Sequence, residues 1–162
     1  MRTLTSLIAL LCPLVLHQTE ALAQTVYHVD MKLEGMIDPG VSAFVERVIE
    51  DAEANEVDAI VFEIDTFGGR VDAATVIRDA ILDSEALTIA FINKRAISAG
   101  ALISLACDKI VMAQAGTMGA TTPVDGSGTK ASDKVTSYMR AEMRATAEST
   151  GRDAKIAEAM VD

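Results

Sequence analysis

The chain has 162 residues, half of them hydrophobic, and carries 24 acidic against 14 basic side chains, for a formal net charge of -10. One domain with a sizeable core fits this length and apolar content. The charge disfavours nucleic acid and anionic membrane surfaces as main partners, because both repel an acidic protein.

The first 23 residues have the pattern of a secretory signal. Arg2 supplies a positive start, Leu4 to Leu16 is mostly apolar, and Ala21-Leu22-Ala23 fits a small-residue cleavage site. This pattern predicts residues 1–23 as a signal peptide and 24–162 as the mature domain, exported to the periplasm or to the outer face of a membrane. An uncleaved anchor is the alternative.

Cleavage of the signal would leave His28 and Cys107 as the only histidine and the only cysteine. A single cysteine cannot form an internal disulfide, and one histidine with one cysteine does not make a zinc site. We therefore expect no metal and no other cofactor, and we expect Cys107 to be a buried core residue.

Strand and helix patterns alternate along the rest of the chain. Strands are expected at Val26–Leu33, Ala59–Ile64, Leu87–Ile92 and Lys109–Ala113. Helices are expected after Asp38, from Val71, after Ser98, over 132–150 and at the chain end, while Gly116–Lys130 has a loop composition. The alternation indicates βαβ units, and so an α/β fold with a mainly parallel sheet. The helical pattern runs to Asp162 without a stop signal, as in a fragment of a longer protein.

Ser98 is the first candidate for chemistry. It directly precedes the apolar run Ala101–Cys107, where a serine is a good helix N-cap. A hydroxyl at the positive end of a helix is also a candidate nucleophile, because that end stabilises an alkoxide or an oxyanion. In this second interpretation Gly100 keeps the approach to the hydroxyl open.

The glycine pair Gly68-Gly69 follows one predicted strand and precedes a helix. A tight turn explains this position, but the same turn can bring backbone N–H groups close to a substrate carbonyl. The pair is not part of a nucleotide-binding motif, because neither G-x-G-x-x-G nor the phosphate-binding loop pattern is present.

A nucleophilic serine needs a base. His28 lies on the first predicted strand, Lys94 and Lys109 border strands, and Lys130 lies in the loop. Lys134 would stand in the first helical turn after Ser132, where the helix dipole disfavours the ammonium form. Burial would still have to supply most of the effect that makes this amine neutral, and a solvated lysine is the alternative.

Several segments together resemble the protease domain of the NfeD-type membrane-bound serine proteases, relatives of signal peptide peptidase A and, more distantly, of ClpP and the crotonase fold. The segments are Asp65–Val71, Arg95–Ala101, Asp108–Ala113, Gly116–Ala120, and Lys134–Tyr138 followed by Gly151–Asp153. The resemblance extends from Val26 to Asp162. It implies a ClpP/crotonase-like α/β fold of repeated ββα and βαβ units.

The resemblance also implies roles for individual residues. Ser98 matches the nucleophile and Lys134 the general base of a Ser-Lys dyad. The N–H groups of Gly68 and Ala99 match the oxyanion hole, with Gly69 supporting the turn. Phe67 stands where family members often have proline, which should alter the rim of the cleft more than the chemistry.

At the level of the whole protein, the resemblance implies a serine endopeptidase that cleaves hydrophobic segments of membrane-associated proteins, with stomatin-like proteins as possible substrates. It also implies a homodimer or larger assembly. Longer members continue into membrane-spanning helices, which would attach the domain to the membrane.

Two other functions fit the sequence. A non-catalytic ClpP-fold interaction module that assists a membrane protein complex would explain the short chain. A crotonase-type enzyme acting on acyl thioesters would share the glycine N–H geometry, but coenzyme A thioesters are mainly cytoplasmic and the signal sequence argues for export.

Overall fold

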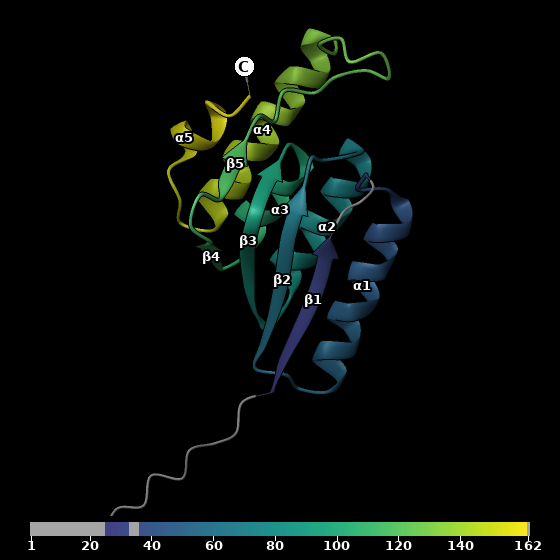
Figure 1. Cartoon of the computed structure of the whole chain (residues 1–162), viewed down its shortest axis with the longest axis vertical. Helices are drawn as coiled ribbons and strands as arrows, with labels where there is room; N and C mark the ends of the chain where they lie inside the picture. Colours follow the sequence, from purple (N-terminus) through teal and green to yellow (C-terminus); the bar gives the residue numbers. More distant parts are fainter. Residues whose placement is uncertain (1–24, 33–35, 162) are drawn as a thin grey trace, which may run out of the picture.

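The computed structural model describes residues 25–32 and 36–161 and forms one α/β unit (Figure 1). Its strands are β1 (Val26–Lys32), β2 (Ala59–Thr66), β3 (Leu87–Ile97), β4 (Lys109–Met112) and β5 (Thr117–Gly119). Its helices are α1 (Pro39–Ala54), α2 (Val71–Asp83), α3 (Ala99–Ala106), α4 (Asp133–Ser149) and α5 (Ala154–Glu158).

The strands form a parallel sheet in the order β1-β2-β3-β4, and β5 pairs with the end of β3. Parallel neighbours need long crossover connections, which α1, α2 and α3 provide in turn. All carboxyl ends of the central strands therefore meet at one edge, where ligands bind in open α/β sheets. The predicted α/β class and parallel sheet are confirmed.

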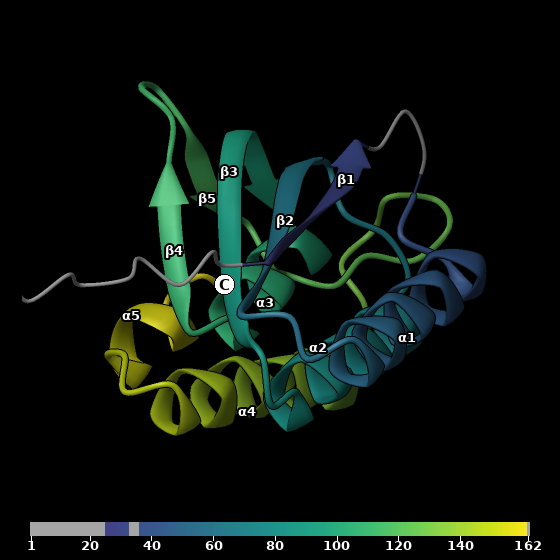
Figure 2. The same cartoon turned by 90° about the horizontal axis from the view of Figure 1, so that it is seen from below.

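The described helices cover one face of the sheet (Figure 2). β2 alternates buried with half-buried residues, and its buried face carries Ile60, Phe62 and Ile64, which are fully inaccessible. α3 is buried along its whole length, as its uniformly apolar sequence predicts. The core thus lies between the sheet and the helices, and it fixes the strand ends that build the site.

α1 begins as its sequence predicts. The Asp38 carboxylate accepts hydrogen bonds from the N–H groups of Gly40 and Val41, and Pro39 occupies the first helical position. This cap fixes where the chain enters the helix. The preceding residues, Met36 and Ile37, are thereby held beside the glycine turn that follows β2.

Two boundaries differ from those predicted. β3 continues from Ile92 to Ile97, because its polar end pairs with β5. β5 itself lies inside Gly116–Lys130, which was predicted to be loop throughout, and three residues are too few to show a strand period.

No helix within residues 25–32 and 36–161 has the length and hydropathy that a bilayer crossing requires. The predicted signal, residues 1–23, lies outside the described residues.

Candidate active site

Ser98 lies at the junction of β3 and α3, in a strained backbone conformation. Its φ of 55° and ψ of -116° are rare for a residue with a side chain. The Ser98 N–H donates to the Gly119 carbonyl at 2.9 Å, and the Ser98 carbonyl accepts from the Ala101 N–H at 2.9 Å. A serine held in a sharp strand-to-helix turn is the arrangement of a nucleophile elbow, which presents the hydroxyl to substrate.

Ser98 occupies the N-cap position of α3, as predicted, but the capping role expected of its side chain is wrong. The side chain makes no capping hydrogen bond to the first turn of α3. A capping serine needs an extended backbone, which aims its oxygen at the helix N–H groups, and the positive φ prevents this. Ser98 is instead one of the residues that line a pocket.

Gly68 lies directly against this serine. A Cβ at Gly68 would lie 2.6 Å from Ser98 Cβ and 3.0 Å from Ser98 Oγ, and the φ of Gly68 is 113°. No other residue fits both the space and the backbone. The Gly68 N–H donates to Thr66 Oγ1 at 2.8 Å, so it is engaged inside the turn. Thr66 is fully buried, which keeps this bond dry.

Gly69 joins the turn to the segment before α1. The Ile37 N–H donates to the Gly68 carbonyl at 3.0 Å, and the Arg70 N–H donates to the Ile37 carbonyl at 2.8 Å. The N–H of Gly69 itself makes no hydrogen bond within the described part of the chain, and Gly69 lines the Ser98 pocket. The site therefore offers one uncommitted N–H from the glycine turn.

The start of α3 offers a second one. The N–H of Ala99, the first helical residue, has no hydrogen-bond partner among the described residues, as is usual for the first turn of a helix.

Gly100 has a different role from the one expected. Its missing side chain does not keep the approach open, because a Cβ there would lie 2.5 Å from Thr66 Cγ2 inside the core. Gly100 lets the helix pack closely on β2.

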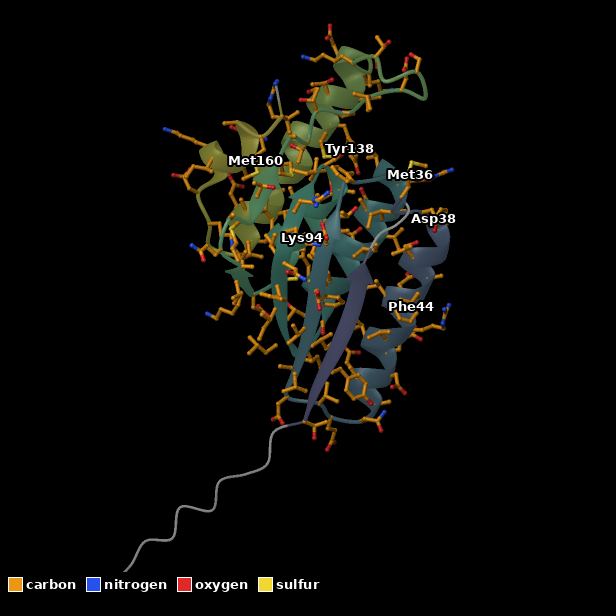
Figure 3. The ribbon with its side chains drawn as sticks, in the orientation of Figure 1. Met36, Asp38, Phe44, Lys94, Tyr138 and Met160 are labelled. Carbon is orange, nitrogen blue, oxygen red and sulfur yellow. The ribbon has the colours of Figure 1, made fainter. Side chains whose placement is uncertain are left out.

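The pocket around Ser98 has a volume of about 760 Å³. Its walls come from Met36, the turn 67–71, Ile97-Ser98 and parts of the segment 120–126. Three of its rim residues are large apolar side chains that are strongly exposed: Phe67 at 73%, Met36 at 68% and Val124 at 61%. Figure 3 shows Met36 near Asp38, by the start of α1. An exposed apolar rim of this kind suits an apolar ligand.

The side chain of Arg95 packs on the ring of Phe67. The Arg95 guanidinium lies 4.6 Å from the centre of the Phe67 ring, and Arg95 Nε lies 3.1 Å from Asp65 Oδ1. Sequence reasoning placed Phe67 at the rim but missed Arg95. It also missed Thr66, although a threonine two residues before a glycine is a known turn signal.

The segment 119–122 is held at both ends. Its Gly119 carbonyl accepts from the Ser98 N–H, and its Thr121 N–H donates to the Met160 carbonyl at 2.8 Å. Met160 follows α5, and the next residue, Val161, accepts a hydrogen bond from Arg140 of α4 at 3.0 Å. The pocket wall is thus tied to the last described turn of the chain.

Lys134 lies in the first turn of α4, as predicted, and its side chain is exposed. It is not among the described residues that line the Ser98 pocket. Tyr138, one turn later, lies 3.4 Å from Thr75 of α2 and lines a neighbouring cavity of about 580 Å³. That cavity shares Arg70 and Val71 with the Ser98 pocket. These contacts place Tyr138, in the second turn of α4, beside the site, and the dyad stays a prediction.

The other candidate bases lie elsewhere. Lys94 of β3 has its Nζ 3.7 Å from Oδ2 of Asp65 on β2, and Lys109 and Lys130 are exposed. The side chain of His28 on β1 lies outside what the structure describes. Among the described residues no cluster of three or more His, Cys, Asp or Glu side chains could hold a metal ion.

Two carboxylates near the pocket are held in their charged form. The hydrogen bond from Arg70 lowers the pKa of Asp72 to about 2. At the other rim, hydrogen bonds from the side chain and N–H of Ser127 lower the pKa of Asp125 from its ordinary value. Asp125 lines the Ser98 pocket, and Asp72 lines the neighbouring cavity.

Comparison with known proteins identifies relatives along nearly the whole described chain. Residues 25–162 match the family model of the NfeD1b N-terminal domain. Membrane protein NfeD1b of Bacillus subtilis is 42% identical over 139 residues, which cover 86% of this chain and 31% of the relative. Membrane-bound protease PH1510 of Pyrococcus horikoshii is 33% identical over 148 residues, which cover 86% and 33%. The chain spans about a third of the length of these curated relatives.

Solved structures show the same relationship. A serine-to-alanine variant of 1510-N, a membrane-bound stomatin-specific protease, matches with a TM-score of 0.78 at 33% identity, covering 85% of this chain and 70% of that one. A lysine-to-alanine variant in complex with a substrate peptide matches with a TM-score of 0.78 at 32% identity, covering 85% and 66%. ClpP1 from Listeria monocytogenes matches at 0.58 and 20% identity, covering 85% and 78%, which shows the fold alone. The chain belongs to the NfeD1b N-terminal domain family and has the fold of ClpP-type proteases.

Proposed function

We propose that this domain is a serine endopeptidase that uses Ser98 and Lys134 as a dyad. The observation that carries the proposal is the strained turn at Ser98, which presents an uncapped hydroxyl to a pocket with an apolar rim. Strain of this kind persists only where the surrounding structure enforces it, and it clusters at active sites. The homologous PH1510 protease supports the same reaction class.

In the proposed reaction, Ser98 Oγ attacks the carbonyl carbon of a peptide bond while the neutral amine of Lys134 takes its proton. The carbonyl oxygen becomes an oxyanion that accepts hydrogen bonds from backbone N–H groups. The C–N bond then breaks, and the Lys134 ammonium gives its proton to the leaving amine. Water hydrolyses the resulting ester and returns Ser98 to its free form.

The oxyanion donors follow from the hydrogen bonds of the turn. The family resemblance assigns the N–H groups of Gly68 and Ala99. Because the Gly68 N–H already donates to buried Thr66, we assign the first donor to Gly69 and keep Ala99 as the second. Gly68 then provides the space in which the substrate carbonyl approaches Ser98.

The role of Lys134 requires a change in its surroundings. Lys134 is exposed, and a lysine acts as a base only where its amine is shielded from water. Closure of the first turn of α4 over the pocket, or its burial by a partner subunit, would meet this requirement. The 1510-N structures include variants of a serine and of a lysine, the same residue types as Ser98 and Lys134.

The substrate proposed is a hydrophobic segment of a membrane-associated protein. The exposed apolar rim formed by Met36, Phe67 and Val124 supports this class. The stomatin specificity stated for 1510-N extends the proposal to a stomatin-like membrane protein. We further propose that the domain acts on the exported side of the membrane, as a homodimer or larger assembly.

Cleavage of a hydrophobic peptide by the full chain tests the dyad. Ser98→Ala should reduce the rate to background, and Lys134→Ala should reduce it by about 10²- to 10⁴-fold, as loss of a general base does. Lys130→Ala is the matched control, because Lys130 is also exposed near the start of α4 but has no assigned role. Undiminished cleavage by either dyad variant contradicts the proposal.

The exposed position of Lys134 favours one alternative, a non-catalytic interaction module. Covalent labelling of the protein by a fluorophosphonate, abolished in Ser98→Ala, would count against that alternative. A module without enzymatic activity should instead bind its partner equally well with Ser98 or Ala at this position.

A further inference from the structure

Phe67 has the largest exposed fraction, 73%, of the exposed large hydrophobic side chains in the described part of the chain. With Met36 and Val124 it forms an exposed apolar patch at one pocket, and such a patch marks an interaction site. Phe67 lines the pocket of Ser98 and is followed directly by Gly68, which lies against that serine. Phe67 therefore lines the same pocket as the serine proposed to attack the substrate.

The ring is held in position by its neighbours. The guanidinium of Arg95 lies 4.6 Å from the ring centre, a distance at which a cation is attracted to an aromatic face. Arg95 is in turn fixed by Asp65, with 3.1 Å between Nε and Oδ1. The sheet brings the three residues together, because Thr66 on β2 pairs with Ala96 on β3. Phe67 is thus exposed and yet preorganised, which lowers the entropy lost on binding.

Charge favours an apolar occupant over an ionic one. The guanidinium of Arg95 lies over the ring, and it is paired with Asp65, which also lies 3.7 Å from the amine of Lys94. The guanidinium is therefore not available to recruit an acidic side chain. Met36 and Val124 at the same rim add apolar surface.

We propose that Phe67, positioned by Arg95 and Asp65, is the specificity-determining residue of this domain. It selects a polypeptide that places a large apolar side chain, aromatic or long aliphatic, beside the peptide bond to be cleaved. Arg95 occupies one face of the ring, and the substrate side chain packs on the ring surface that lines the pocket. The inference rests on the proposed endopeptidase function and goes beyond it by assigning the selection to one side chain.

A peptide-binding assay tests the inference without depending on cleavage. The full chain carrying Ser98→Ala is titrated into fluorescent apolar peptides in which one position at a time is Phe, Leu, Ala or Asp, and the anisotropy gives each Kd. We expect one position where Phe or Leu binds about ten- to hundred-fold more tightly than Ala, the range that apolar pockets achieve. Adding Phe67→Ala should reduce this preference to about threefold or less while binding of the Ala peptide stays the same.

Two variants separate specificity from fold damage. Phe44→Ala is the control, because Phe44 is 44% exposed on α1 and does not line the pocket (Figure 3). It should leave the preference unchanged. Arg95→Met removes the stacked charge but keeps an apolar stem, and it should reduce the preference by a few-fold without altering Phe67.

The outcomes are distinguishable from those of the dyad test. A preference that depends on Phe67 in a protein that cleaves nothing supports the selection of an apolar side chain by Phe67 and refutes the endopeptidase. Cleavage that depends on Ser98, with a preference unchanged by Phe67→Ala at every position, refutes the inference and leaves the endopeptidase standing. If none of the peptides binds, the inference is also overturned.

Discussion

Replacing Gly69 with alanine should break the joint between the glycine turn and the segment before α1. A Cβ at this position would lie 2.6 Å from Ile37 Cα and closer still to the backbone N and O of Ile37. These are backbone atoms, which cannot rotate away as the end of a flexible side chain can. The segment carrying Ile37 must therefore move as a whole.

The size of the effect follows from what that movement disrupts. Two backbone hydrogen bonds connect Ile37 to Gly68 and Arg70, at 3.0 and 2.8 Å. Losing both costs about 2 kcal/mol, at about 1 kcal/mol for each bond. Ile37 is fully buried, and partial exposure of an isoleucine side chain adds about 1–2 kcal/mol. We expect Gly69→Ala to lower the free energy of unfolding by about 3–4 kcal/mol, the sum of these two losses.

Urea unfolding followed by circular dichroism measures this change. Gly126→Ala is the matched control, because Gly126 lines the same pocket and a Cβ there meets nothing within 4 Å. It should change stability by less than about 0.5 kcal/mol, as surface substitutions usually do. A loss below about 1 kcal/mol in Gly69→Ala would show that the close approach of the two backbones does not constrain the fold.

Three further predictions concern other parts of the chain. Ser98→Gly should be about 1 kcal/mol more stable than Ser98→Ala in the same urea assay, because glycine relieves the strain of the positive φ; equal stability would contradict it. Burial raises the pKa of the Cys107 thiol. In a Cys12→Ser protein, where Cys107 is the one remaining cysteine, a thiol reagent should therefore react only after unfolding. Rapid reaction of the native protein would disprove the burial of Cys107. Hydrogen bonds from Ser127 lower the pKa of Asp125, so the turn that these bonds form should be stable at neutral pH. The turn should be lost as the pH falls through the lowered pKa of Asp125. If the amide chemical shift of Ser127 does not change on acidification, this prediction is wrong.

Much of the fold could be predicted because its signals are local. The start of α1 is specified by Asp38 and Pro39, whose side chains cap the helix and fix its first φ. β2 and α3 are specified by their apolar patterns. The extension of β3 beyond Ile92 has no such signal, since its polar residues become strand only by pairing with β5, a partner more than twenty residues further along the chain.

In the candidate site, too, some features could be predicted from the sequence and others could not. The proximity of Gly68 and Ser98 follows from topology, because both residues stand at the carboxyl ends of neighbouring parallel strands. The backbone of Ser98 could not be predicted, since its positive φ is imposed by tertiary contacts that include the carbonyl of Gly119. The same holds for the stacking of Arg95 on Phe67, which depends on the register of β2 and β3.

The segment 119–122 connects Ser98 to the chain that follows the short helix α5. The carbonyl of Gly119 accepts a hydrogen bond from the Ser98 N–H. The N–H of Thr121 donates to the carbonyl of Met160, just after the five-residue helix α5. A short helix with few buried side chains opens far more often than a buried core does. The position of the Ser98 N–H therefore depends on the opening equilibrium of α5, so that activity can be lost at temperatures where the sheet is still intact.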